Sequence, residues 1–192
     1  MRMSISNILT IIRALGSFLL FALFYLYHEQ NAVWAMKVSL PLFIIFSLTD
    51  YIDGMLARLW KQETVFGRIA DPFVDKILVC GSFIFLAPIK DSFITPWVII
   101  IIIGREFLVS GLRSYLEGKG LPFGALFWGK AKVASQYTAI GWLIFYIAYL
   151  KHEAFQQSFT IFCIYAVSII TALSAIAYVY RAIKLLKGTD LV

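Results

Sequence analysis

The sequence contains few of the residues on which structural metal sites and disulfides usually depend. Its 192 residues include two cysteines and two histidines, and only 15% of them are charged. Cys80 and Cys163 both lie in apolar runs, so we interpret them as packing residues rather than as a disulfide or a metal-binding pair. The low charge content, together with 61% hydrophobic residues, excludes an ordinary soluble domain. The composition instead predicts one compact helical bundle in a lipid bilayer.

The chain also lacks a basic patch, a repeat and a linker. Its net charge is +6, but the basic residues are dispersed at the ends of apolar runs, which argues against a nucleic acid as the partner. The charge favours contact with anionic lipid head groups or anionic substrates. Without an internal repeat or a low-complexity linker, residues 1–192 are expected to form a single domain. The first apolar run is too long for a cleavable signal peptide and has no small-residue cleavage site.

Long apolar runs are abundant. About 20 apolar residues span the hydrocarbon core of a bilayer, and by that measure the chain has six predicted spans, separated by short polar or turn segments. The expected fold is therefore an all-α integral membrane protein, a bundle of six transmembrane helices. The predicted spans cover residues 8–27, 33–59, 68–89, 93–116, 129–150 and 155–183.

The distribution of lysine and arginine predicts the orientation of this bundle. If the N-terminus is cytoplasmic, most of the basic residues fall in cytoplasmic segments, whereas only Lys37, Lys90 and Lys151 fall outside. By the positive-inside rule, both termini are then cytoplasmic. The connection between the second and third spans faces the cytoplasm too.

Four aspartates, Asp50, Asp53, Asp71 and Asp75, flank that connection. A carboxylate in a transmembrane segment is costly and marks a functional site, and four together would repel one another unless cations held them. Asp50 and Asp53 are three residues apart, and Asp71 and Asp75 are four apart, so each pair shares one face of its helix. Two antiparallel neighbouring helices can therefore bring all four acids together.

Carboxylate oxygens favour Mg²⁺ or Mn²⁺ over softer metals. His28 and His152 both map to the opposite face of the membrane, which argues against iron or zinc. Four carboxylates can balance two divalent cations, and phosphoryl transfer profits from such a pair. The alternative is that the acids only cap helices near the interface. Asp71 before Pro72 has the pattern of an N-cap followed by proline at the first helical position.

The whole motif resembles the signature of the CDP-alcohol phosphotransferase family. It reads Asp50-x2-Asp53-Gly54-x2-Ala57-Arg58-x8-Gly67-x3-Asp71-x3-Asp75, with every position filled. The resemblance implies six spans, a homodimer, and transfer of a phosphatidyl group from CDP-diacylglycerol to an alcohol with release of CMP. It also implies that Asp50, Asp53 and Asp71 bind the metals, that Asp75 is the general base and touches metal, and that the CDP moiety is bound by Gly54, Ala57, Arg58 and Gly67.

Outside the signature, the chain is similar to bacterial members of that family that use sn-glycerol-3-phosphate as the acceptor, which implies an enzyme of the bacterial inner (cytoplasmic) membrane with its active site facing the cytoplasm. The matching stretches are Asn7 to Arg13, Arg105-Glu106 with Gly111 to Arg113, and Gly129 to Lys132 followed by Gln136. Ser6 and Val133 depart from this likeness, standing where a proline and a threonine are common.

Cations on the predicted cytoplasmic side indicate an anionic acceptor. Arg105 and Arg113 are eight residues apart, so they can border one cavity at depths about 12 Å apart, and Lys130 and Lys132 begin the fifth span. Arginine and lysine together suit a phosphate monoester. We therefore predict that all four hold the phosphate of glycerol-3-phosphate. The alternatives are interfacial anchoring for the lysines and pairing with Glu106 for Arg105.

Two further groups of polar residues have no single predicted role. Asn7, Thr10 and Arg13 recur every three residues at the start of the first span, so they either line the nucleotide pocket or lie at the head-group interface. Lys76 follows Asp75 but points elsewhere on its helix, and we expect it to reach to the interface.

Two other functions were weighed. The same chemistry with inositol phosphate as the acceptor would also use the arginines. A divalent-metal transporter would need polar residues through the whole depth of several helices, whereas the outer halves of the spans are unbroken apolar sequence.

Overall fold

The computed structural model describes the backbone of residues 5–60, 65–124, 126–150 and 154–189. Within these ranges, the side chains of residues 5–8, 50–60, 65–69, 71 and 188–189 lie outside the described set. Every described element is helical. The long helices are α1 (Ile5–Gln30), α2 (Val33–Trp60), α3 (Val65–Leu86), α4 (Pro96–Gly118), α5 (Phe127–Phe145) and α6 (Ala154–Thr189). A 3-10 turn, η1 (Lys90–Ser92), precedes α4, and a π-helical turn, η2 (Tyr146–Leu150), extends α5.

The six long helices coincide with the six apolar runs of the sequence to within a few residues at most ends. Backbone geometry explains two of the ends. Asn31 follows α1 with a φ of 51°, a left-handed conformation that asparagine tolerates and that ends the helix. Its N–H donates to Tyr27 O at 2.9 Å. Gly120, with a φ of 75°, follows α4 in a Schellman motif, in which Leu121 N–H bonds to Leu116 O at 2.9 Å.

The structure excludes the alternative that Asp71 caps the start of a helix. Pro72 lies inside α3 rather than at its start, since α3 begins at Val65. Asp71 is therefore not the N-cap residue that its position before a proline indicates. Proline interrupts one main-chain hydrogen bond, but the helix continues through it, so Asp71 and Asp75 lie one turn apart on the same continuous helix. Pro41 interrupts α2 in the same way.

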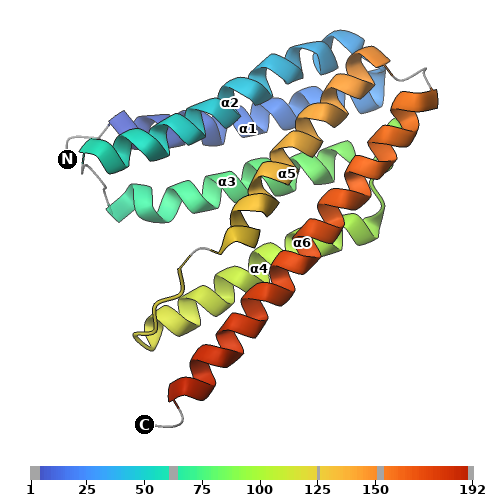
Figure 1. Ribbon diagram of the computed structural model, residues 1–192. Helices are drawn as coiled ribbons and strands as arrows, with labels where there is room; N and C mark the ends of the chain where they lie inside the picture. The colour runs from blue at the N-terminus through green and yellow to red at the C-terminus, as the bar shows by residue number, and fades with distance from the viewer. Residues whose placement is uncertain (1–4, 61–64, 125, 151–153, 190–192) are drawn as a thin grey trace.

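The helices run alternately in opposite directions (Figure 1). Helix α1 packs against α2 and α3, helix α5 packs against α2 and α6, and α4 packs chiefly against α6. As a result, α1 begins and α6 ends on the side that also carries the α2–α3 and α4–α5 connections (Figure 1). We call this side the polar end, because the predicted site residues map to it.

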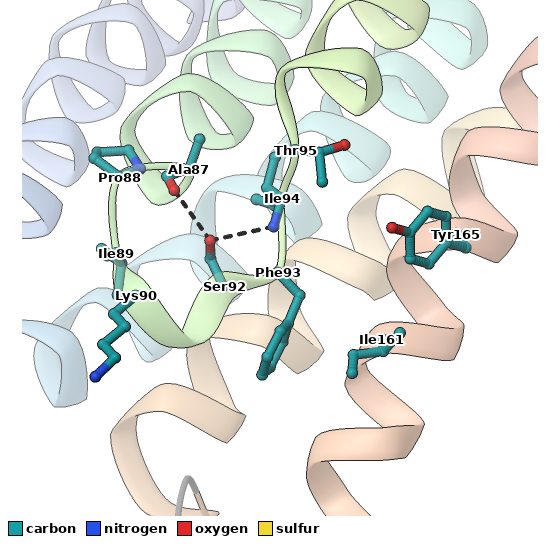
Figure 2. A pocket seen from close by; sticks show the side chains of 10 residues that line it. All are labelled: Ala87, Pro88, Ile89, Lys90, Ser92, Phe93, Ile94, Thr95, Ile161 and Tyr165. Carbon is teal, nitrogen blue, oxygen red and sulfur yellow. Dashed lines mark hydrogen bonds between the residues drawn. The ribbon is translucent and has the colours of Figure 1, made fainter.

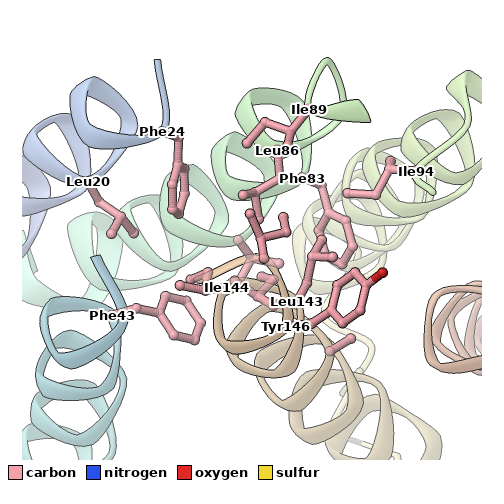
Figure 3. Close-up of a cluster of buried hydrophobic side chains, with 14 of the residues drawn as sticks. Leu20, Phe24, Phe43, Phe83, Leu86, Ile89, Ile94, Leu143, Ile144 and Tyr146 are labelled. Carbon is pink, nitrogen blue, oxygen red and sulfur yellow. The ribbon is translucent and has the colours of Figure 1, made fainter. Parts of the chain in front are cut away.

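A large apolar core occupies the other half of the bundle (Figure 3). Fully buried side chains from α1, α3 and α5 meet there, among them Phe24, Phe83 and Leu143. A smaller cluster, formed by Val109, Leu116, Phe123, Tyr178 and Ala182, packs α4 against α6 nearer the polar end. We call these the large core and the small cluster.

Length and hydropathy identify three candidate membrane spans among the described residues, Leu9–Gln30, Phe127–Leu150 and Ala154–Lys187. Val33–Thr49 is a shorter apolar stretch of α2. Helix α4 is about as long as the first two of these candidate spans, but it contains four charged residues, Arg105, Glu106, Arg113 and Glu117. Three such helices indicate a multi-pass membrane protein.

Candidate active site

Polar side chains are buried between the large core and the small cluster. On α4, Arg105 and Glu106 lie between Ile102 of the large core and Val109 of the small cluster, and on α6, Thr171 and Ser174 lie between Val167 and Tyr178. Burying polar groups is unfavourable unless they bond to one another. We call this level the polar layer, and its described members are Asp75, Arg105, Glu106, Lys132, Gln136, Tyr137, Thr171 and Ser174.

Asp75 occupies the α3 side of this layer. Its half-buried carboxylate accepts, at Oδ1, a hydrogen bond from the hydroxyl of Tyr137 on α5. The ring of Tyr137 lies 5.9 Å from that of Phe43 on α2, measured between centroids, so the hydroxyl is held by packing as well as by the bond. This contact ties the predicted general base to a helix more than sixty residues further along the chain.

The next residue, Lys76, also bonds across helices. Its ammonium donates to Ser110 Oγ on α4, so it does not simply reach to the membrane interface, as expected from the sequence. Ser110 lies between Glu106 and Arg113 on α4. The bond therefore connects the α3 end of the polar layer with the helix that carries the two predicted arginine ligands.

A buried ion cluster joins α4 and α5. Glu106 Oε1 forms an ion pair with Lys132 Nζ at 2.5 Å and accepts a hydrogen bond from Arg105 Nη1 at 3.2 Å. The three residues are only 8%, 7% and 3% exposed for Arg105, Glu106 and Lys132. Two cations and one carboxylate leave the cluster with one excess positive charge, which is costly to bury without an anion.

Helix α6 fixes Arg105 from the other side. Its Nε and Nη2 both donate to Ser174 Oγ, at 3.2 Å and 2.8 Å, and its guanidinium carbon lies 5.2 Å from the centre of the Tyr178 ring. Gln136, one turn after Lys132, donates to Thr171 Oγ1 at 3.3 Å. These contacts hold α4, α5 and α6 together through polar groups.

The four predicted acceptor ligands therefore fall into two pairs. Arg105 and Lys132 are buried and paired with Glu106, which is the alternative that the sequence left open for Arg105. Lys132 is too buried to serve as an interfacial anchor. Arg113 on α4 and Lys130 in the first turn of α5 are exposed. Whether any of the four binds an acceptor phosphate stays a prediction.

The predicted metal ligands are only partly described. Helices α2 and α3 carry Asp50, Asp53 and Asp71 in helical backbone, but the side chains of these three lie outside the described residues. Among the side chains that the structure does describe, no three histidines, cysteines, aspartates or glutamates are grouped closely enough to hold a metal. The donor set itself, four carboxylates on two antiparallel helices that both pack against α1, fits hard divalent cations.

The predicted nucleotide-binding residues are also only partly described. Gly54, Ala57, Arg58, Gly67 and Asn7 lie outside the side chains that are described. Thr10 and Arg13 are described and almost fully buried, at 3% and 2% exposure, so they face the bundle interior rather than its lipid-facing surface. Their predicted part in the nucleotide pocket is not tested by this burial.

Cavities lie between several of the helices. One of about 530 Å³ lies between α2 and α5, with Phe43, Ser47, Tyr137 and Trp142 in its walls, so it adjoins the residue that contacts Asp75. Another, of about 320 Å³, lies at the α3–α4 connection (Figure 2), where Ser92 donates to Ala87 O at 3.2 Å. Its lining is mainly apolar, with Lys90 as the one charged residue.

Sequence reasoning missed Tyr137, the role of Glu106 as a bridge to Lys132, and the α6 partners Ser174 and Tyr178. A usable signal was present: Lys132 and Gln136 are four residues apart, and polar side chains at helical spacing in an apolar span indicate an inward-facing polar site. The partner of each could not be derived, because it depends on how the helices are rotated against one another.

The chain belongs to the CDP-alcohol phosphatidyltransferase family, whose family model matches residues 3–179. This confirms the resemblance drawn from the aspartate motif.

Three individual proteins of known name are similar to this chain. A protein of Cereibacter sphaeroides is 37% identical over 155 residues, which are 79% of this chain and 67% of the relative. One of Haemophilus influenzae is 30% identical over 184 residues, 95% of each chain, and one of Bacillus subtilis is 42% identical over 103 residues, 54% and 52% of the two chains. All three are named CDP-diacylglycerol–glycerol-3-phosphate 3-phosphatidyltransferase.

Proposed function

We propose that this chain transfers the phosphatidyl group of CDP-diacylglycerol to sn-glycerol-3-phosphate, forming phosphatidylglycerophosphate and CMP. The observation that carries this proposal is the similarity to the Haemophilus influenzae protein, which is named for that reaction and aligns over 95% of both chains. The polar layer supports it, because it holds Asp75 and a buried cluster with excess positive charge, and because Tyr137, which bonds to Asp75, lines an apolar cavity.

In the proposed reaction, the acceptor hydroxyl oxygen attacks the phosphorus that bears the diacylglycerol. A new oxygen–phosphorus bond forms, the bond from that phosphorus to the CMP oxygen breaks, and Asp75 takes the hydroxyl proton. Tyr137 orients Asp75 by bonding to Oδ1, which leaves Oδ2 for the proton. Two divalent cations, Mg²⁺ or Mn²⁺, held by Asp50, Asp53, Asp71 and Asp75, would supply charge neutralisation on the diphosphate.

The substrates would approach from different directions. The cavity between α2 and α5 is lined mainly by apolar side chains and offers space for an acyl chain of the lipid. Gly54, Ala57, Arg58 and Gly67, with Asn7 and Thr10, would bind the CDP moiety. Arg105, Arg113, Lys130 and Lys132 would bind the phosphate of the acceptor, since arginine and lysine both suit phosphate oxygens.

The proposal includes the topology and the location of the protein in the membrane. We propose six membrane spans with both termini in the cytoplasm, an arrangement that the six long helices and the positive-inside rule support. The polar end would then face the cytoplasm at the inner membrane of a bacterium. The protein would act there as a homodimer, as the family resemblance implies.

The structure gives no support to the transporter alternative. A transport path needs polar groups through the full depth of the bundle. In the described part of the chain, the half opposite the polar end is filled by the large core, where Phe24, Phe83 and Leu143 are fully buried.

The test is CMP release by the purified protein with CDP-diacylglycerol and Mg²⁺, measured across a panel of acceptors. Release with glycerol-3-phosphate well above that with inositol phosphate, serine or glycerol is the expected result. Release with inositol phosphate but not with glycerol-3-phosphate would reassign the acceptor. No release with any alcohol would refute the transferase assignment.

A further inference from the structure

Glu106 is the one described carboxylate that contacts two of the predicted acceptor ligands. Its Oε1 atom lies 2.5 Å from Lys132 Nζ and 3.2 Å from Arg105 Nη1. All three side chains are more than nine-tenths buried. A substitution at Glu106 therefore acts on the acceptor ligands from both α4 and α5 at once.

The two cations depend on Glu106 to different degrees. Arg105 has further partners, because Ser174 Oγ accepts from its Nε and Nη2 and the Tyr178 ring lies beneath it. For the ammonium of Lys132, the described contacts give one partner, Glu106. Removing the carboxylate would leave Arg105 near its place but release Lys132, since a buried ammonium without a counter-ion moves toward water.

Hydrogen-bond donors remain after these contacts are made. A guanidinium has five N–H donors, and three of those of Arg105 are used by Ser174 and Glu106. An ammonium has three, and that of Lys132 forms an ion pair with Glu106. The unused donors and the net positive charge of the cluster are features that suit an anion, and both cations contact the same carboxylate oxygen.

We propose that Glu106 is the positioning residue of the acceptor site: it holds Lys132 beside Arg105 so that both can bind the phosphate of the acceptor alcohol. The proposal rests on the proposed function. Stability alone does not account for the carboxylate, because well-packed apolar groups can replace a buried ion cluster without loss of stability. The Glu106 carboxylate instead fixes the distance between the charged groups of Arg105 and Lys132, and binding a phosphate monoester with both groups requires that distance to be fixed.

The decisive variant is Glu106→Gln, which keeps the size and removes the charge. We expect the KM for glycerol-3-phosphate to rise by about tenfold or more, the size of effect expected from losing one charge-assisted contact, with the KM for CDP-diacylglycerol unchanged. Glu106→Asp retains the charge and should recover part of the loss. Glu117→Gln, an exposed carboxylate on the same helix, is the matched control and should behave as the wild type.

A role confined to holding the helices together gives a different result. In that case Glu106→Gln would lower the thermal unfolding temperature and kcat while leaving the acceptor KM unchanged, and Glu106→Asp would not restore acceptor affinity selectively. Either outcome would overturn the proposal.

A second pair of variants keeps the test decisive if Glu106→Gln folds poorly. Glu106→Gln combined with Lys132→Met leaves no unpaired lysine in the cluster. If Glu106 acts through Lys132, the double variant has the acceptor KM of Lys132→Met alone, because effects on one unit do not add. Additive effects would contradict the proposal. Failure of the proposed function can be distinguished from failure of the Glu106 proposal. In the first case the wild-type protein itself would release no CMP with glycerol-3-phosphate.

Discussion

The large core and the polar layer are neighbouring parts of the same helices, but they are buried by different means. In the large core, Phe24, Phe83 and Leu143 exclude solvent completely and need no directional bonds. In the polar layer, Arg105, Glu106 and Lys132 are buried nearly as deeply but only with paired charges. Shape complementarity holds the first region together, whereas the second depends on the charge of each member.

This contrast separates stability from chemistry along single helices. Helix α5 contributes Leu143 to the large core and Lys132 and Tyr137 to the polar layer, three turns or less apart. Truncating an apolar side chain should weaken the fold and leave substrate affinities alone. Changing a polar one should alter turnover or a KM, whether or not it also lowers the unfolding temperature by breaking a buried pair. Four substitutions, in order of decreasing expected effect on kcat/KM, test this separation.

Asp75→Asn should have the largest effect. Loss of a general base lowers rates by about 10²–10⁴-fold, so kcat should fall by at least about 100-fold while CDP-diacylglycerol still binds. The measurements are CMP release and binding of the lipid nucleotide in the presence of Mg²⁺. Asp91→Asn, at the opposite end of the bundle in η1, is the control with an unchanged rate. Turnover by Asp75→Asn close to the wild-type rate would remove this residue as the base.

Arg113→Ala comes next. Removing a charge-assisted contact costs about 1.5–3 kcal/mol, so the KM for glycerol-3-phosphate should rise by roughly tenfold or more, with a smaller change in kcat. Lys187→Ala removes an exposed cation from the last turn of α6 and should leave the KM unchanged. An unaltered KM in Arg113→Ala would exclude Arg113 from the acceptor site.

Tyr137→Phe should reduce kcat by up to about tenfold, because it removes the hydrogen bond to Asp75 Oδ1 while keeping the ring beside Phe43. The substrate KM values and the unfolding temperature should change little. Tyr149→Phe, an exposed tyrosine in the π-helical turn that follows α5, serves as the control. If both variants turn over equally fast, the bond does not orient the base.

Leu143→Ala should have the smallest effect on turnover and the largest on stability. A leucine-to-alanine change in a packed interior costs about 2–5 kcal/mol, so the thermal unfolding temperature should drop clearly. Below that temperature both KM values should match the wild type. Leu173→Ala, at a 44% exposed position on α6, should lower the unfolding temperature far less. An altered acceptor KM in Leu143→Ala would show that the two regions are not separable.

Much of the fold was predictable because hydropathy and turn residues mark helix ends. The expected span over residues 33–59 matches α2, Val33–Trp60, and that over 129–150 matches α5 with its π-helical turn. The expected span over residues 68–89 also matches α3, Val65–Leu86, so the alternative of Asp71 as an N-cap before Pro72 is excluded. In the described residues, three of the six helices pass a strict test of length and hydropathy.

The candidate site was predictable in composition but not in its contacts. Helical spacing groups Asp71 with Asp75 and Arg105 with Arg113, because both pairs lie on single helices. It cannot reveal that Tyr137 bonds to Asp75, or that Glu106 pairs with Lys132, because these contacts join residues from different helices. The rotation and tilt of each helix decide them, and side-chain packing across the whole bundle sets both.

The most direct test is to count Mn²⁺ ions bound to the purified protein in the presence of CDP-diacylglycerol, by equilibrium binding and by electron paramagnetic resonance. Two ions per chain, with a spin-coupled signal that Asp75→Asn weakens and Asp91→Asn leaves intact, is the expected result. No bound ion, or binding unaffected by replacing Asp50, Asp53 and Asp71 with asparagine, would contradict a catalytic metal site at the polar end.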